Sequence, residues 1–125
     1  MITRILLVED NEISREILAR RLRKAGYEVL EAEDGEAAVK AATELSPAVV
    51  LMDMNLPKID GWEAIRELRR SPSGAHTPVI ALTAHSLPAD RNRALAAGCD
   101  EFESKPVEFR SLLRKIETLL ARQPS

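Results

Sequence analysis

Several features are scarce in this chain of 125 residues, and each scarcity excludes a class of protein. A single cysteine, Cys99, excludes an internal disulfide bond and fits a reducing compartment. No apolar run approaches the ~20 residues of a membrane span, and the N-terminus shows no signal-peptide pattern. Positive charge is not in excess: 18 basic and 20 acidic residues argue against nonspecific nucleic-acid binding. We therefore expect a cytoplasmic protein without nucleic-acid or membrane partners.

What is present is an alternation of two apolar patterns. Short β-branched runs lie near 4–8, 27–31, 48–52, 78–82 and 100–104, and helical spacing follows at 11–25, 34–45, 60–68, 87–97 and 107–122. This alternation predicts an α/β fold in which five helices cover both faces of a doubly wound, five-stranded parallel sheet. The length fits one domain spanning 1–125, with a core over 2–121 and a frayed end at 122–125.

The helical segments differ in the apolar surface that they offer to a core. In 11–25, one face carries Ile13, Ile17, Leu18 and Leu22. Segment 107–122 is the strongest amphipathic helix, whereas 87–97 offers mostly alanine, which predicts a helix that can shift at little cost. We expect Trp62 and Cys99 to be packing residues rather than recognition or redox-sensing groups.

Polar residues stand where four of the strand-like runs end. The runs stop at Glu9-Asp10, Asp53, Thr83 and Lys105, in that order along the chain. Parallel strands bring their carboxyl ends to one edge of the sheet, where ligands bind. An unpaired buried carboxylate is costly, so Asp53 needs a cation or a ligand beside it.

These residue types together suit phosphoryl transfer. Three carboxylates repel one another unless a cation lies among them, and Mg²⁺ prefers such oxygen ligands. Asp53 would be the nucleophile that forms an aspartyl phosphate. Lys105 would neutralise charge on the phosphoryl oxygens, and Thr83 could donate a hydrogen bond to one of them.

Five short motifs resemble those of response-regulator receiver domains of two-component signalling, over residues 2–121. They are Leu7-Val8-Glu9-Asp10-Asn11, Asp53-Met54-Asn55-Leu56-Pro57, Asp60-Gly61, Ala81-Leu82-Thr83-Ala84 and Lys105-Pro106. The resemblance implies a flavodoxin-like sheet with strand order 2-1-3-4-5. It also implies a phosphodonor, either a histidine kinase or a histidine phosphotransfer protein. The protein would not be a conventional enzyme, but would catalyse phosphotransfer to its own Asp53 and the later hydrolysis.

The resemblance also assigns roles to single residues. Asp53 would be the phosphoacceptor, and Mg²⁺ would be held by Glu9 (mostly through a water), Asp10, Asp53 and the Asn55 backbone carbonyl. The phosphoryl-binding and switch residues would be Thr83, Ala84, Lys105 and Phe102.

Two residues depart from the family pattern, and one histidine has an open role. Phe102 has no hydroxyl group where the family often has tyrosine, so it is either a packing-based switch or simply a core residue. Glu103 replaces a residue that is more often apolar, on a strand expected at the sheet edge. His85 is either a modulator of hydrolysis or a solvated loop histidine.

We expect a stand-alone response regulator that signals to an unknown protein target through the face formed by 87–122, as a monomer or a phosphorylation-dependent homodimer. The alternatives are a phosphate sink or relay intermediate, and a phosphorylation-independent binding module. A haloacid-dehalogenase-type phosphatase is disfavoured because Asn55 stands where that family needs a second aspartate. A flavin carrier is disfavoured because Glu9-Asp10-Asn11 would repel its phosphate.

Overall fold

The computed structural model describes residues 2–56, 60–84 and 88–122, the side chains of Pro88 and Asp90 excepted. Over these residues the strands are β1 (Arg4–Val8), β2 (Glu28–Ala32), β3 (Val49–Asp53), β4 (Val79–Thr83) and β5 (Glu101–Ser104). The helices are α1 (Glu12–Lys24), α2 (Gly35–Leu45), α3 (Gly61–Arg70), α4 (Pro88–Ala97) and α5 (Phe109–Ala121). All strand pairs are parallel and their order is β2-β1-β3-β4-β5, so the predicted fold and the edge position of β5 are confirmed.

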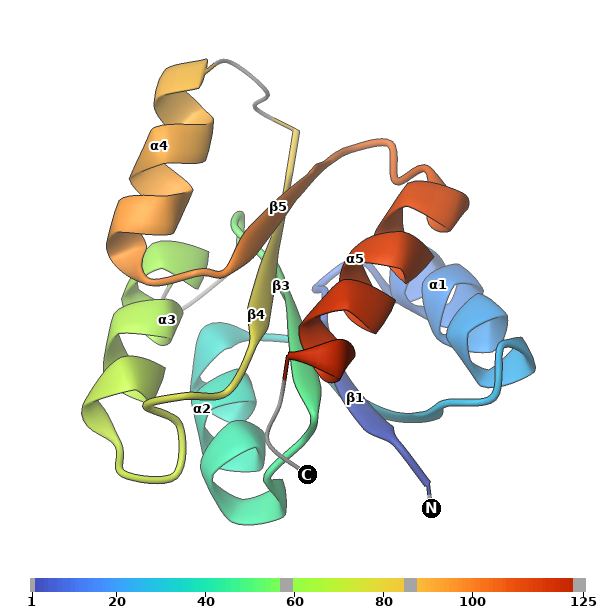
Figure 1. The fold of residues 1–125 in the computed structure, drawn as a ribbon, viewed down its shortest axis with the longest axis horizontal. Helices are drawn as coiled ribbons and strands as arrows, with labels where there is room; N and C mark the ends of the chain where they lie inside the picture. The colour runs from blue at the N-terminus through green and yellow to red at the C-terminus, as the bar shows by residue number, and fades with distance from the viewer. Residues whose placement is uncertain (1, 57–59, 85–87, 123–125) are drawn as a thin grey trace.

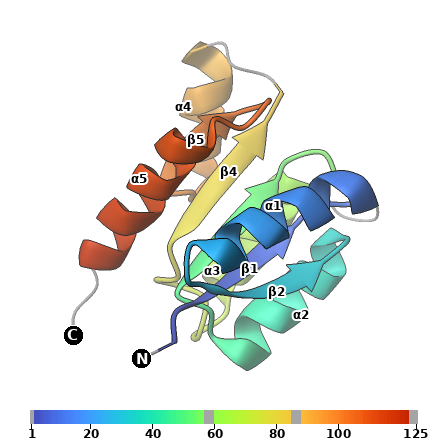
Figure 2. The ribbon, with the colours of Figure 1, turned by 90° about the vertical axis from the view of Figure 1, so that its right-hand side faces the viewer.

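The sheet divides the interior into two apolar clusters. Helices α2, α3 and α4 cover one face, and α1 and α5 cover the other (Figure 1). Figure 2 shows α1 and α5 from their own side. The strands supply both clusters because successive side chains of a strand point to opposite faces: Leu6 and Val8 belong to the first cluster, and Ile5 and Leu7 to the second.

The central strands β3 and β4 end in Asp53 and Thr83, two of the candidate site residues predicted from the sequence. All five residues of β3 and of β4 are buried, as expected for parallel strands covered on both faces. Asp53 is the last residue of β3 and lies opposite Leu82, and Thr83 is the last residue of β4 and lies opposite Ser104. The strands therefore begin and end within about one residue of the predicted runs, and Asp53 and Thr83 belong to them.

Side-chain caps start α1, α2 and α3 close to the carboxyl edge of the sheet, and Glu108 caps α5 in the same way. Asn11, Asp34 and Asp60 accept hydrogen bonds from the backbone N–H groups of Ser14, Ala37 and Glu63 at 2.9, 2.8 and 2.9 Å. Since Asn11 follows Glu9-Asp10 directly, its cap fixes where the acidic pair ends and α1 begins.

The expected apolar face of α1 is only half buried. Leu22 is buried and Leu18 is partly buried, but Ile13 is 70% and Ile17 54% exposed. The prediction of one shared face is wrong for these two isoleucines, because at about 100° per residue Leu18 and Leu22 lie about 140° and 180° around the helix from Ile13.

The two C-terminal helices differ as predicted. In α5, Leu112, Ile116 and Leu119 are buried, whereas Ala94 is the one buried side chain of α4 among those described, and Leu95 is 40% exposed. Trp62 packs against the first apolar cluster and Cys99 is buried, which confirms their packing roles. Within the described residues, no helix is long and apolar enough to cross a membrane.

Candidate functional site

Three carboxylates meet at the carboxyl edge of β1 and β3. One ligand oxygen from each of Glu9, Asp10 and Asp53 lies within 4.8 Å of the other two. Glu9 and Asp53 are buried, with 8% and 2% of their surface exposed, and Asp10 is exposed. Such a group of hard oxygen donors, open on one side, fits a Mg²⁺ ion that keeps several of its waters.

Lys105 is the cation that accompanies these carboxylates. Its Nζ atom lies 3.0 Å from Asp53 Oδ2 and 3.2 Å from Glu9 Oε1, so it bridges the two buried acids. Burial alone would lower the pKa of Lys105, but the hydrogen bonds and negative charges of Asp53 and Glu9 outweigh burial and raise it. Lys105 therefore remains charged beside Asp53.

The crowding of carboxylates changes the protonation of Glu9. Its pKa is raised from 4.5 to about 7, first by burial and then by hydrogen bonding with Asp53 and by the charge of Asp53. Lys105 acts in the opposite direction but does not cancel these effects. One ammonium group is thus insufficient for three carboxylates, and a further cation would relieve the excess negative charge.

The backbone around Asp53 is held by close packing. Asn55 donates its N–H to Asp53 Oδ1 at 3.0 Å, and its side chain is exposed. A Cβ atom on Gly61 would lie 2.6 Å from Met54 Cα and 2.7 Å from the carbonyl oxygen of Asp53. Only glycine at the start of α3 allows this approach, so Gly61 supports the segment around Asp53 through its lack of a side chain.

Thr83 ends β4 beside Asp53 and is 2% exposed. Its carbonyl oxygen accepts a hydrogen bond from the Lys105 N–H at 2.7 Å, which places the lysine backbone next to Thr83. The Lys105–Pro106 peptide bond is cis. Ala84 follows Thr83 and is exposed, and His85 lies outside the described residues.

Phe102 and Glu103 lie on β5 and are both buried. Phe102 is 8% exposed and belongs to the apolar cluster on the α4 side, a position that fits both a core residue and a packing-based switch. The Glu103 carboxylate accepts hydrogen bonds from Ser111 Oγ at 3.0 Å and Lys115 Nζ at 2.8 Å. Lys115 also donates to the Phe102 carbonyl oxygen at 2.6 Å. Glu103 is therefore a buried, paired charge rather than a charge at the rim of the sheet.

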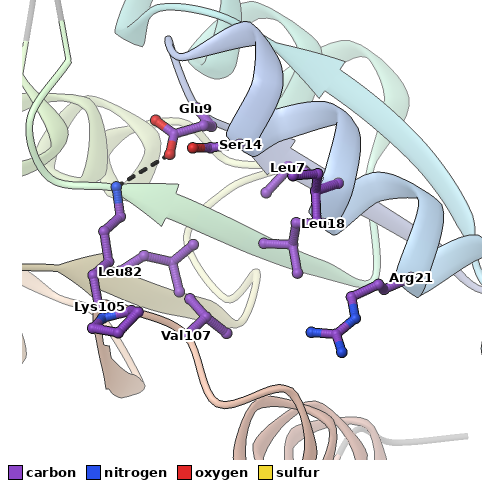
Figure 3. Close-up of a pocket in the computed structure, with 10 residues that line it drawn as sticks. Leu7, Glu9, Ser14, Leu18, Arg21, Leu82, Lys105 and Val107 are labelled. Carbon is purple, nitrogen blue, oxygen red and sulfur yellow. Dashed lines mark hydrogen bonds and ion pairs between the residues drawn. The ribbon is translucent and has the colours of Figure 1, made fainter.

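An apolar cavity of about 270 Å³ opens beside the acidic site, between α1 and the segment that joins β5 to α5. Leu7, Leu18, Leu82 and Val107 lie between Glu9 and Lys105 at one end and Arg21 at the other (Figure 3). The exposed Ile17 and Pro106 also line it. The cavity thus continues from the candidate phosphorylation site along the surface of α1.

Three contributors to this region were not predicted from the sequence. Arg15 donates to the Glu9 carbonyl oxygen at 2.8 Å, Gly61 permits the close approach to Asp53, and Lys115 pairs with Glu103. From the sequence alone, Arg15 and Lys115 cannot be distinguished from ordinary exposed cations on helix surfaces. The Asp60-Gly61 pair was a usable signal, because a glycine at a helix start often marks a close backbone contact.

Comparison with known proteins identifies the family. Residues 5–117 match the response regulator receiver domain. The chain is 35% identical over 115 residues to the polar-differentiation response regulator DivK of Brucella anthropi, covering 92% of this chain and 91% of DivK. It is 33% identical over 119 residues to RpaA of Synechocystis, a DNA-binding dual master transcriptional regulator, and spans 49% of that relative's length.

Solved structures give the same result. The receiver domain of the sensor histidine kinase PA1611 from Pseudomonas aeruginosa, which has a magnesium ion coordinated in its active-site cleft, is 37% identical with a TM-score of 0.90, over 97% of this chain and 99% of that one. The chemotaxis response regulator CheY4 of Vibrio cholerae is 28% identical with a TM-score of 0.89, over 95% and 99% of the two chains.

The fold and the site therefore define a phosphoacceptor module of two-component signalling. The chain belongs to the response regulator receiver domain family, whose members take phosphoryl groups from histidine kinases.

Proposed function

We propose that this protein carries a phosphoryl group on Asp53 and that Asp10, Glu9 and the Asn55 carbonyl help to hold Mg²⁺ beside it. The observation that supports this most directly is the position of Asp53 at the end of β3, with Lys105 Nζ 3.0 Å away and two further carboxylates beside it. The three oxygen donors fit Mg²⁺, which when bound would neutralise charge on the phosphoryl oxygens.

The side chains of the site divide the work of the transfer. A new bond forms between an Asp53 carboxylate oxygen and phosphorus, while the P–N bond of a phosphohistidine donor breaks and the imidazole leaves with the electron pair. The Asn55 N–H holds Oδ1 of Asp53, which orients the carboxylate. Lys105 then exchanges its contact with the carboxylates for one with a phosphoryl oxygen. The protein thereby accelerates its own phosphorylation and, with water in place of the donor, the hydrolysis.

The phosphodonor docks on α1 and on the cavity beside it. Its histidine must reach Asp53, so the surface around that histidine must cover the rim of the site, and the cavity begins at that rim with Glu9 and Lys105. Ile13 and Ile17 are exposed on the same helix, and Arg20, Arg21 and Lys24 lie exposed farther along it. A histidine kinase or phosphotransfer protein with an apolar, acid-flanked face around its histidine would complement this surface.

The phosphoacceptor assignment is tested by Asp53→Asn, with Asp60→Asn as a matched control because asparagine also caps a helix. After incubation with a small phosphodonor and Mg²⁺, intact-mass spectrometry should show a phosphorylated fraction for the wild type and for Asp60→Asn, and none for Asp53→Asn. Full phosphorylation of Asp53→Asn would overturn the assignment.

The docking surface is tested by Ile17→Ser, with Ile2→Ser as the control because Ile2 is 73% exposed and precedes β1 at the opposite end of the sheet. Ile17→Ser should slow transfer from the cytoplasmic part of a cognate histidine kinase about tenfold, because a buried apolar contact of this size is worth roughly 1–2 kcal/mol. Uptake from a small phosphodonor should stay unchanged. Equal slowing by both variants would contradict the assignment of the donor to this surface.

A further inference from the structure

The C-terminal end of α4 is fixed by one arginine of α3. The Arg69 guanidinium donates twice to the Gly98 carbonyl oxygen, at 3.0 and 2.8 Å, and once each to the carbonyls of Gly74 and Thr77 and to Asp100 Oδ2, at 2.9, 2.6 and 2.9 Å. All five of its N–H donors are therefore used. Gly98 has a φ of +113°, which glycine adopts readily and which reverses the chain from α4 toward β5.

β5 is likewise fixed on the side of α5. Lys115 joins the Phe102 carbonyl and the Glu103 carboxylate, and Ser111 donates to the same carboxylate. Charge-assisted hydrogen bonds that are largely shielded from water resist sliding of the strand against the helix. We therefore expect β5 and α5 to move together, whereas α4 can change its position relative to them.

α4 itself is held weakly along its length. Ala94 is its one buried side chain among those described. Its contact with α3 includes the Arg93 guanidinium, which lies over the ring of Trp62 with 4.4 Å between the Cζ atom and the ring centroid. Trp62 directly follows Gly61, the glycine that packs against the backbone of Asp53 and Met54. The Arg93–Trp62 contact therefore joins α4 to the part of α3 that adjoins the phosphoacceptor.

We infer that the Arg93–Trp62 contact is a regulatory latch: it holds α4 on α3 before phosphoryl transfer and opens when Asp53 is phosphorylated, as α4 pivots about Gly98. This inference rests on the proposed function of Asp53. Lys105 contacts both buried carboxylates, so a phosphoryl oxygen on Asp53 would compete with them for its ammonium group. A cation–π contact at an exposed position changes such an equilibrium about two- to fivefold, enough to bias the switch and small enough to be reversed.

The natural protein carries its own reporter, because Trp62 is the single tryptophan of the chain. Trp62 emission is measured with and without beryllofluoride and Mg²⁺ in the wild type, Arg93→Ala, Arg93→Lys and Arg91→Ala. Arg91 is an exposed arginine of the same helix and provides the matched control. The rate of phosphorylation by a small phosphodonor is measured on the same four proteins.

If the contact is a latch, Arg93→Ala without beryllofluoride should already show the emission that the wild type reaches with it. Its phosphorylation should be about two- to fivefold faster, because the competent arrangement is more populated. Arg93→Lys should lie between the two, and Arg91→Ala should match the wild type. The latch is overturned if the wild type is phosphorylated on Asp53 while Trp62 emission stays constant. It is also overturned if Arg93→Ala and Arg91→Ala show the same emission and the same phosphorylation rate. If Asp53 takes up no phosphoryl group, the proposed function fails and the latch fails with it.

Discussion

Glu103 on β5 forms a 2.8 Å ion pair with Lys115 on α5, and the Glu103 side chain is only 7% exposed. Taking a carboxylate out of water is costly, and Lys115 and Ser111 offset that cost by saturating one of its oxygens. The pair therefore makes the packing of α5 on β5 depend on two specific residues, in addition to the apolar contacts that α5 makes with the sheet.

Lys115→Met should destabilise the protein by about 2–4 kcal/mol, because it leaves the Glu103 carboxylate buried with only a hydroxyl partner. The free energy of unfolding in urea measures this loss. The double variant Glu103→Leu with Lys115→Met should recover most of the stability, since both charges are then absent. A double variant as unstable as Lys115→Met would show that the loss comes from packing and not from the unpaired carboxylate.

Glu9→Gln should stabilise the metal-free protein at pH 8. The Glu9 pKa is raised from 4.5 to about 7 on folding, so the native state binds the proton more tightly than the unfolded state. The contribution of Glu9 to stability is therefore full below pH 4.5 and is lost as the pH rises toward 7. With screening taken into account, the gain for Glu9→Gln is on the order of 1–2 kcal/mol.

Thermal unfolding of Glu9→Gln at pH 4.5 and at pH 8 in a chelator measures this difference, with the exposed Glu44→Gln as control. The wild type and Glu44→Gln, which both keep Glu9, should lose stability between pH 4.5 and pH 8, and Glu9→Gln should lose less. If all three proteins change in parallel, the crowding of carboxylates is not what sets the pH dependence.

Gly61→Ala should both destabilise the fold and impair phosphoryl uptake. The added Cβ would meet backbone atoms of Asp53 and Met54, which cannot move aside as a flexible side chain does, at a cost of about 1–3 kcal/mol. Gly26→Ala is the comparison, because Gly26 has a φ of +102° but open space around it. Both variants should unfold at lower urea concentration, but only Gly61→Ala should show slower uptake by Asp53. Normal phosphoryl uptake by Gly61→Ala would show that this glycine does not support the site.

Cys99 should be unreactive in the folded protein. Burial is the main cause that raises the pKa of its thiol from 9.0 to about 11, which lowers the thiolate fraction at pH 8 about 100-fold. A disulfide reagent should therefore react at least that much more slowly in buffer than in urea. Because the folded-state pKa is raised, this thiol also favours the native state below pH 9 and ceases to do so as the pH rises through 11. Rapid labelling in buffer would contradict its burial.

The sequence predicted the sheet and the acidic site because both depend on local signals. The strands β1, β3 and β4 are largely apolar runs, and Asp53 and Thr83 stand at the ends of β3 and β4, so parallel pairing of these two strands brings them together. Strand order was not encoded in this way and came from the family resemblance. The hydrogen-bond partners of long side chains were not predicted either. The spacing of Lys115 or Arg15 on a helix is the same whether the side chain contacts water or a buried strand.

The error at α1 has a different cause. At about 100° per residue, Leu22 lies about 180° around the helix from Ile13, so the four apolar residues do not form one face. Leu22 and Ala19 belong to the buried side, and Ile13 and Ile17 lie on the exposed side. Apolar residues spaced five and nine positions apart are therefore not evidence of a single buried stripe.

The division of the interior into two clusters by the sheet makes the two faces separately adaptable. The side chains under α1 and α5 share few neighbours with those under α2, α3 and α4, so substitutions on opposite faces should combine additively. The proposed docking surface for the donor lies on the side of α1 and α5, and the Arg93–Trp62 contact lies on the side of α2, α3 and α4. Selection can therefore retune which kinase is recognised without resetting the equilibrium that the phosphoryl group controls.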